Sequence, residues 1–252
     1  MKRIAAFTYG VICYAIFFGT FLYAVGFVGN FIVPKSIDST PVGPLGEALL
    51  INALLLGLFA VQHSVMARPA FKRWWTRFVP KPVERSTFVL FASLALIALF
   101  AYWQPIGGVI WDVQNPVGRD ILYGLCAFGW GLVLVATFLI NHFDLFGLRQ
   151  VWLHLRGKEY RPLNFGTPGL YKIVRHPLYV GFFFAFWATP TMTAAHLFFA
   201  LMTTVYILIA IRFEEHDLVT EHGMRYSEYR KQVPMLVPRL GGRPSGIDPE
   251  AT

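Results

Sequence analysis

The amino-acid sequence predicts an all-α integral membrane protein, a polytopic bundle of transmembrane helices. Hydrophobic residues make up 56% of the 252 residues and charged residues only 14%, a composition unlike that of a soluble domain. Several apolar runs approach or exceed the roughly 18 residues that cross a bilayer. Lys and Arg are concentrated in alternate connections between these runs, which is typical of a multi-pass protein with a fixed orientation.

The apolar runs predict four transmembrane helices followed by a C-terminal helical hairpin. The four helices are expected at residues 5–33, 45–65, 86–103 and 121–140, and the hairpin at residues 178–211. The first run is too long for the core of a cleaved signal peptide, so we interpret it as a retained helix. The last region is interrupted near Pro190 and its first half is short for a complete crossing. Two helices are therefore expected there instead of one.

The distribution of basic residues predicts the orientation. Segments 66–85 and 141–177 carry six Lys or Arg residues each, and the tail from Arg212 is also basic. The connections at 34–46 and 104–120 carry one each. By the positive-inside rule, both termini and both basic segments lie in the cytoplasm. Topology and attraction to anionic lipid account for the net charge of +8, so no nucleic-acid partner is expected.

We expect residues 1–240 to form a single membrane domain and residues 241–252, which are polar and rich in Gly and Pro, to form a disordered tail. Cys13 and Cys126 lie inside apolar runs and are interpreted as small buried hydrophobic residues. The histidines do not follow a metal-binding spacing, so no metal is predicted. The sequence predicts no particular oligomeric state.

The informative polar residues are concentrated at the cytoplasmic side. In "VRHPLYVG", at residues 174–181, Arg175 and His176 precede an apolar run, where they are either interfacial anchors or ligand-binding groups. Glu214 and Glu215 directly follow the last apolar run, although a helix C-terminus favours cations. The position of these two carboxylates therefore needs another explanation, unless the helix continues into water and ends at Gly223.

Three further side chains are candidates for proton transfer. His142 and Asp144, just past the fourth helix, form either a base with its orienting carboxylate or a helix cap with a solvated aspartate. His63, at the cytoplasmic end of the second helix, is more simply a hydrogen-bonded residue of the membrane boundary.

In combination, "GLYKIVRHPLYVG", a helical hairpin, "RFEE" and "GMRYSEYRKQVP" form one signature at residues 163–239. It resembles the isoprenylcysteine carboxyl methyltransferase superfamily of integral-membrane methyltransferases, which includes phospholipid methyltransferases and relatives of the nitrite-reductase accessory protein NnrU. Two upstream segments, "QHSVMARPAFKRWWTRFVPKPVERSTFVL" and "NHFDLFGLRQVWLHLRGKEYRPLNF", are similar to the bacterial methanethiol S-methyltransferases. The resemblance thereby extends over most of the chain.

This resemblance implies an enzyme of the bacterial cytoplasmic (inner) membrane that uses S-adenosylmethionine to convert methanethiol to dimethyl sulfide. It places the cofactor at the cytoplasmic face, where a helix starting near residue 177 offers free N–H groups to the cofactor carboxylate. The implied cofactor-binding residues are Leu163, Asn164, Phe165, Gly166, Tyr171, Arg175, His176, Leu178, Tyr179 and Glu214.

One departure from the superfamily concerns the substrate. Where the carboxyl methyltransferases have a substrate-binding Arg four residues before the cofactor glutamate, this chain has Ala210, and the nearest Arg is Arg212. That favours a small apolar thiol over a carboxylate substrate. We expect Arg212 and Glu214 at the reacting centre, with His142 and Asp144 as base candidates and His63 as a more remote one. Two alternatives stay open. One is methylation of an isoprenoid or lipid thiol or carboxylate, and the other is a non-catalytic NnrU-like membrane protein.

Overall fold

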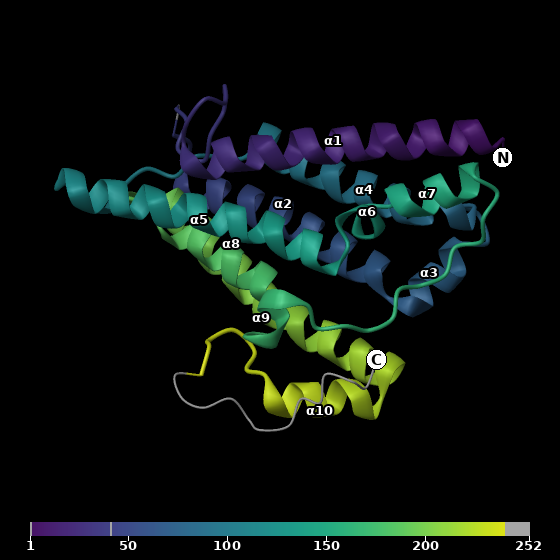
Figure 1. Ribbon diagram of the computed structural model, residues 1–252. Coiled ribbons are helices and arrows are strands. Elements are labelled where there is room, and N and C mark those ends of the chain that lie inside the picture. Colours follow the sequence, from purple (N-terminus) through teal and green to yellow (C-terminus); the bar gives the residue numbers. More distant parts are fainter. Residues whose placement is uncertain (1, 41, 240–252) are drawn as a thin grey trace.

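The computed structural model describes residues 2–40 and 42–239, and in this part the chain is helical apart from one short two-stranded ribbon (Figure 1). Five of its helices are long and apolar enough to cross a membrane: α1 (Arg3–Gly29), α2 (Leu45–Ala67), α4 (Lys81–Tyr102), α5 (Pro116–Ile140) and α9 (Ala194–His222). The predicted all-α, multi-pass architecture is therefore confirmed. The tail expected at residues 241–252 lies outside the described residues.

Shorter elements connect and flank these helices. They are α3 (Pro69–Trp75), β1 (Val109–Asp112), α6 (His142–Leu145), α7 (Leu148–Leu155), the 3₁₀ helix η1 (Gly169–Lys172), α8 (Pro177–Trp187), β2 (Thr191–Thr193) and α10 (Met224–Gln232). The predicted C-terminal hairpin is formed by α8 and α9. Because α8 has 11 residues, it is only roughly 16 Å long and does not cross a bilayer by itself.

Several helix boundaries differ from those expected from hydropathy. The α4 and α5 helices begin before residues 86 and 121, because Pro82 and Pro116 stand in their first turns, where a missing N–H costs nothing. Asn115 caps α5 by accepting a hydrogen bond from the Gly118 amide at 3.0 Å. The α1 helix ends before residue 33, because Asn30 has a left-handed conformation with a φ of 61°.

The chain alternates between the two ends of the bundle (Figure 1). The N-terminal end of α1, the short helices α3, α6 and α7, the start of α8 and the end of α9 with α10 lie at one end. We call this the basic end, because it contains residues 68–80, 141–176 and 223–239. At the other end, β1 pairs antiparallel with β2 and joins the α4–α5 connection to the α8–α9 connection.

The end opposite the basic end contains the main apolar core. Trp103 is fully buried and donates from Nε1 to the Ile37 carbonyl oxygen at 3.0 Å. Asn52, a polar residue within α2, is satisfied by the backbone of Gln104, whose carbonyl oxygen lies 2.7 Å from Nδ2 and whose amide lies 2.8 Å from Oδ1. These polar groups are satisfied within the fold and stabilise it.

The position of α8 depends on a close approach to α5. A Cβ atom added at Gly129 would lie 2.5 Å from the Ala185 amide nitrogen and 2.6 Å from the Gly181 carbonyl oxygen. A Cβ at Gly181 would lie 2.8 Å from the Gly129 carbonyl oxygen. These neighbours are backbone atoms, which cannot rotate away. Small residues thus hold α8 against α5, as is common between helices in membranes.

Gly129→Ala should therefore destabilise the protein by about 1–3 kcal/mol, because the added methyl group forces α5 and α8 apart. The measurement is the midpoint of thermal unfolding in detergent. Gly124→Ala in the same helix is the matched control, since a Cβ there meets no atom within 4 Å. Equal midpoints for the two variants would contradict the close-packing account.

Candidate active site

The stretch at residues 174–181 forms the turn into α8. Pro177 occupies the first helical turn, and no side chain caps the start of this helix. The amides of Arg175 and His176 donate to the carbonyl oxygens of Pro234 and Met235 at 2.9 and 3.2 Å. The segment after α10 therefore runs along the turn and fixes its backbone.

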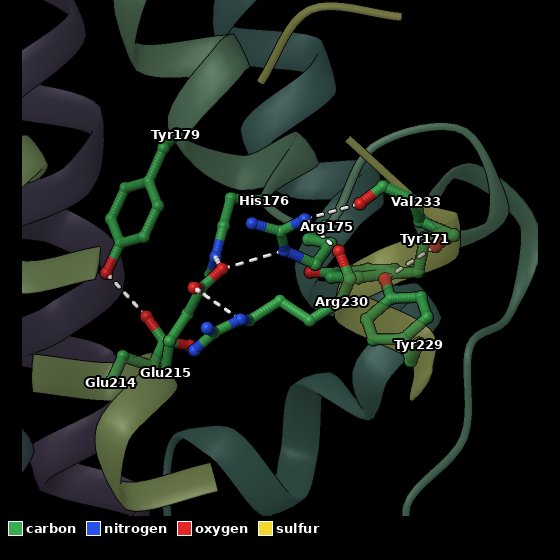
Figure 2. Close-up of polar contacts among 9 residues, drawn as sticks. All are labelled: Tyr171, Arg175, His176, Tyr179, Glu214, Glu215, Tyr229, Arg230 and Val233. Atoms are coloured by element: carbon green, nitrogen blue, oxygen red, sulfur yellow. Dashed lines mark hydrogen bonds and ion pairs between the residues drawn. The ribbon is translucent and has the colours of Figure 1, made fainter. Parts of the chain in front are cut away.

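A buried carboxylate, Glu215, lies at the centre of this region (Figure 2). Its Oε1 accepts from Arg175 Nε at 2.7 Å and lies 3.1 Å from His176 Nε2. Its Oε2 lies 3.9 Å from Arg230 Nε. The Arg175 guanidinium also donates to the carbonyl oxygens of Arg230 and Val233. Because the side chains of Arg175 and Glu215 are only 10% and 11% exposed, this ion pair is shielded from water and stabilised by several hydrogen bonds.

The phase of α9 explains why Glu215 points inward. Ile207, Ile211 and Glu215 follow at intervals of four residues and are all buried, so Glu215 continues the buried stripe of the helix. We expected Glu214 to bind the cofactor and assigned no role to Glu215, which the structure shows to be the carboxylate that pairs with Arg175 and His176. This stripe is the sequence signal that distinguishes the two carboxylates. The interpretation that α9 continues to Gly223 is confirmed, since the helix ends at His222.

Glu214 faces α8 instead. Its Oε2 accepts a hydrogen bond from the Tyr179 hydroxyl at 3.0 Å (Figure 2). Its other oxygen accepts no hydrogen bond from the residues that the structure describes. A half-buried carboxylate with spare acceptor capacity is suited to binding an amino or hydroxyl group.

Aromatic side chains lie beside the two carboxylates. The ring of Phe165 lies 5.6 Å from those of Tyr226 and Tyr229 and 5.1 Å from that of His222. The Tyr229 hydroxyl donates to the Tyr171 carbonyl oxygen at 2.6 Å. Burial raises the pKa of Tyr171, Tyr226 and Tyr229, so all three phenols stay protonated at neutral pH. This aromatic cluster provides flat surfaces and hydroxyl groups, without charge.

The remaining residues expected at the cofactor site lie around this core. Leu163, Asn164 and Gly166 are exposed on the segment leading to η1, and Leu178 is half-buried in the first turn of α8. Arg212 is exposed, and no contact joins it to Glu214 within the described part of the chain. Positions two apart on a helix face different sides, which explains why the expected cluster of Arg212 with Glu214 is not formed.

His142 and Asp144 have separate partners. His142 is buried between the Tyr14 hydroxyl, 2.8 Å from Nε2, and the Thr137 hydroxyl, 2.8 Å from Nδ1. Burial lowers the pKa of His142, so the ring is neutral at pH 7. Asp144 accepts from Arg149 at 2.8 Å. The base with an orienting carboxylate, one of the two interpretations of this pair, is therefore not formed. Both nitrogens of His142 already have partners.

No group of three His, Cys, Asp or Glu side chains that could hold a metal ion is present in residues 2–40 and 42–239. Cys13 and Cys126 are free thiols, buried and half-buried, in keeping with their interpretation as small hydrophobic residues.

Known proteins similar to this chain include a methanethiol S-methyltransferase of Crocosphaera subtropica, which is 60% identical over 241 residues, 96% of this chain and 94% of the relative. A methanethiol S-methyltransferase of Mycobacterium tuberculosis is 54% identical over 238 residues, 94% of this chain and 98% of the relative. The chain belongs to the methanethiol S-methyltransferase family. Nurim of Bos taurus is a more distant relative. It is 32% identical over 173 residues, and the matched region covers 65% of each chain.

No family model matches the chain. No solved structure matches it either. The roles of the site residues in this member of the methanethiol S-methyltransferase family therefore rest on the geometry of this chain alone.

Glu215→Gln should destabilise this family member by about 3–5 kcal/mol, because it leaves the buried Arg175 without its counter-charge. Thermal unfolding in detergent measures the effect. Glu228→Gln, at an exposed position on α10, is the control and should unfold like the parent. If both variants unfold at the parent temperature, Glu215 does not have the structural role described above.

Proposed function

We propose that this protein transfers a methyl group from S-adenosylmethionine to methanethiol and so produces dimethyl sulfide. The observation that carries this proposal is the high identity to proteins named methanethiol S-methyltransferase over 94–98% of their length. In this chain, polar groups converge on the start of α8. They can bind a methyl donor there, as the activity named for these relatives requires.

The residues at the basic end fit S-adenosylmethionine, which carries a carboxylate, an ammonium group, ribose hydroxyls and an adenine ring. The free oxygen of Glu214 can accept from the ammonium group or from the ribose. The amides of Leu178 and Tyr179, in the uncapped first turn of α8, can bind the carboxylate. The half-buried rings of Phe165 and Tyr229 offer aromatic faces to adenine. A Cβ at Gly166 would meet no atom within 4 Å, so there is open space beside this segment.

When bound, S-adenosylmethionine supplies a methyl group activated by a positive sulfonium. The contribution of the chain is to bind and align the reactants. Glu215 holds Arg175 and His176 and thereby positions the first turn of α8, whereas Glu214 and Tyr179 bind the donor directly. Alignment of the acceptor sulfur with the sulfonium–methyl bond is the main requirement of in-line transfer, and fixed geometry can contribute several kcal/mol to it.

The acceptor that fits best is a small neutral thiol. Ala210 stands where the carboxyl methyltransferases have their substrate-binding Arg, and Arg212 is exposed. Position 210 therefore supplies no counter-charge for a carboxylate substrate. We further propose that the basic end faces the cytoplasm at the bacterial inner membrane, following the distribution of Lys and Arg, and that the apolar thiol enters from the bilayer.

The test is to mix detergent-purified protein with S-adenosylmethionine and methanethiol and to follow dimethyl sulfide in the headspace by gas chromatography. Tyr179→Phe should weaken donor binding about 10- to 100-fold, because it removes a hydrogen bond to a charged group. Glu214→Gln should have at least this effect, because the substitution removes the carboxylate itself.

Two conservative substitutions serve as controls. Tyr123→Phe changes an exposed tyrosine on α5, and Glu228→Gln changes an exposed carboxylate on α10, so both should bind the donor and form product like the parent. Tight donor binding without product would redirect the proposal to lipid or isoprenoid thiols. Failure of the parent to bind the donor would refute it.

A further inference from the structure

His63 has a buried polar atom that no other part of the fold explains. It lies near the end of α2, at the basic end, and its Nδ1 is inaccessible to solvent without a hydrogen-bond partner among the described residues. Leaving such a group unpaired costs about 1–3 kcal/mol, so a buried unpaired nitrogen calls for a partner that binds later. By contrast, the buried histidines His142 and His196 both have hydrogen-bond partners.

Two aromatic rings flank the imidazole of His63. The Phe59 ring is stacked on it, with centroids 5.3 Å apart and an interplanar angle of 23°, and the Phe88 ring lies 5.0 Å away. These neighbours come from α2 and α4. The faces of the imidazole are therefore covered by apolar rings, and a hydrogen-bond donor can approach Nδ1 only in the plane of the ring.

Two cations lie near this imidazole. The Arg85 guanidinium lies 4.8 Å from the centroid of the Phe88 ring, which also packs against His63, and Arg68 donates from Nε to the Ser64 carbonyl oxygen at 3.1 Å. Arg68 is held by Asp217 at 2.8 Å, and Arg85 donates to the Leu145 carbonyl oxygen at 2.7 Å, so neither guanidinium is free to turn away. A neutral imidazole has one nitrogen that accepts a hydrogen bond, and the nearby positive charge also favours a thiolate over a thiol.

His63 is close to the groups assigned to the methyl donor. The next residue, Ser64, donates to the Tyr206 hydroxyl at 3.3 Å, and Phe59 packs against the Tyr206 ring at 6.1 Å. Tyr206 precedes Glu214 on α9 by about two helical turns, and Glu214 in turn accepts a hydrogen bond from Tyr179. The end of α2 is thus joined to α9 through Tyr206.

We propose that methanethiol binds at the edge of His63, with its S–H donating to Nδ1, and that His63 takes the thiol proton during methyl transfer. A lone pair on the thiol sulfur forms the new bond to the methyl carbon. The bond from that carbon to the donor sulfur breaks, and its electron pair stays on the donor sulfur. The S–H proton passes to His63 and is released to solvent when the products leave. The overall products are dimethyl sulfide, the demethylated donor, which is now a neutral thioether, and one proton.

This assignment deepens the proposed function and rests on it. It also accounts for acceptor selectivity. The acceptor site is formed by Phe59, Phe88 and Tyr206 around a single nitrogen, which matches one methyl group and one S–H.

His63→Gln and His63→Ala test the proposal. Each should bind S-adenosylmethionine like the parent but form dimethyl sulfide about 100-fold more slowly, the usual contribution of a positioned proton acceptor. The same variants are then assayed with 2,2,2-trifluoroethanethiol, a small thiol that is more acidic than methanethiol. Because more of this thiol is already ionised, the loss should shrink at least several-fold. A purely structural role of His63 would lower both rates equally.

His196→Gln is the matched control. His196 lies at the start of α9, far from the basic end, and is also buried, but its Nε2 is hydrogen-bonded to the Phe186 carbonyl oxygen. Its ratio of rates with the two thiols should equal that of the parent. Unchanged rates in the His63 variants, or equal losses with both thiols, would overturn the proposal.

A second readout does not depend on turnover. In protein labelled with ¹⁵N-histidine, methanethiol added without donor should shift the imidazole resonance that is missing from His63→Gln. No shift of that resonance would also overturn the proposal. If the parent bound methanethiol with this shift but formed no dimethyl sulfide, the proposed function would fail while the thiol site remained.

Discussion

The buried carboxylate of Glu215 is the interaction on which the basic end depends. It joins the turn before α8 to α9, while the guanidinium that it binds also holds the carbonyl groups at the end of α10. Because an unpaired charge in this position would be costly, these three segments are stable only together. The Arg-His-Pro stretch, the glutamate 40 residues later and the Val-Pro segment near the C-terminus therefore form one structural unit. Their joint occurrence in the sequence reflects this single cluster.

That unit matters because α8 cannot anchor itself. With 11 residues it is too short to cross the bilayer, and it is placed by the contact of Gly129 with Gly181 along its length and by Glu215 at its start. Both constraints fix the first turn of α8, whose amides carry no side-chain cap. A helix start that is rigid, uncapped and close to the membrane surface is well suited to bind an anionic group from the aqueous side.

Hydropathy and charge were sufficient to predict the helices, the hairpin and the alternation of the connections, because the bilayer imposes length and polarity on the chain. They could not predict α3, α6, α7 or the β1–β2 ribbon, since these elements are stabilised by tertiary contacts instead of by an apolar run. Within the site, the composite motif pointed to the start of α8 and the end of α9, but it did not single out Glu215 as the carboxylate that pairs with Arg175 and His176. The choice depends on the phase of α9, which is set by the buried stripe through Ile207 and Ile211. Arg212 was expected in the site because it is close in sequence, yet the same helical phase directs it to the surface.

The two adjacent glutamates also show how the chain separates stability from ligand binding. Neighbouring positions on a helix point about 100° apart, so one carboxylate is saturated by Arg175 and His176 while the other keeps an acceptor oxygen toward α8. A donor bound at Glu214 would contribute a positive sulfonium to a region that already contains Arg68 and Arg85. That positive potential stabilises the negative charge that develops on the acceptor sulfur as its proton passes to His63.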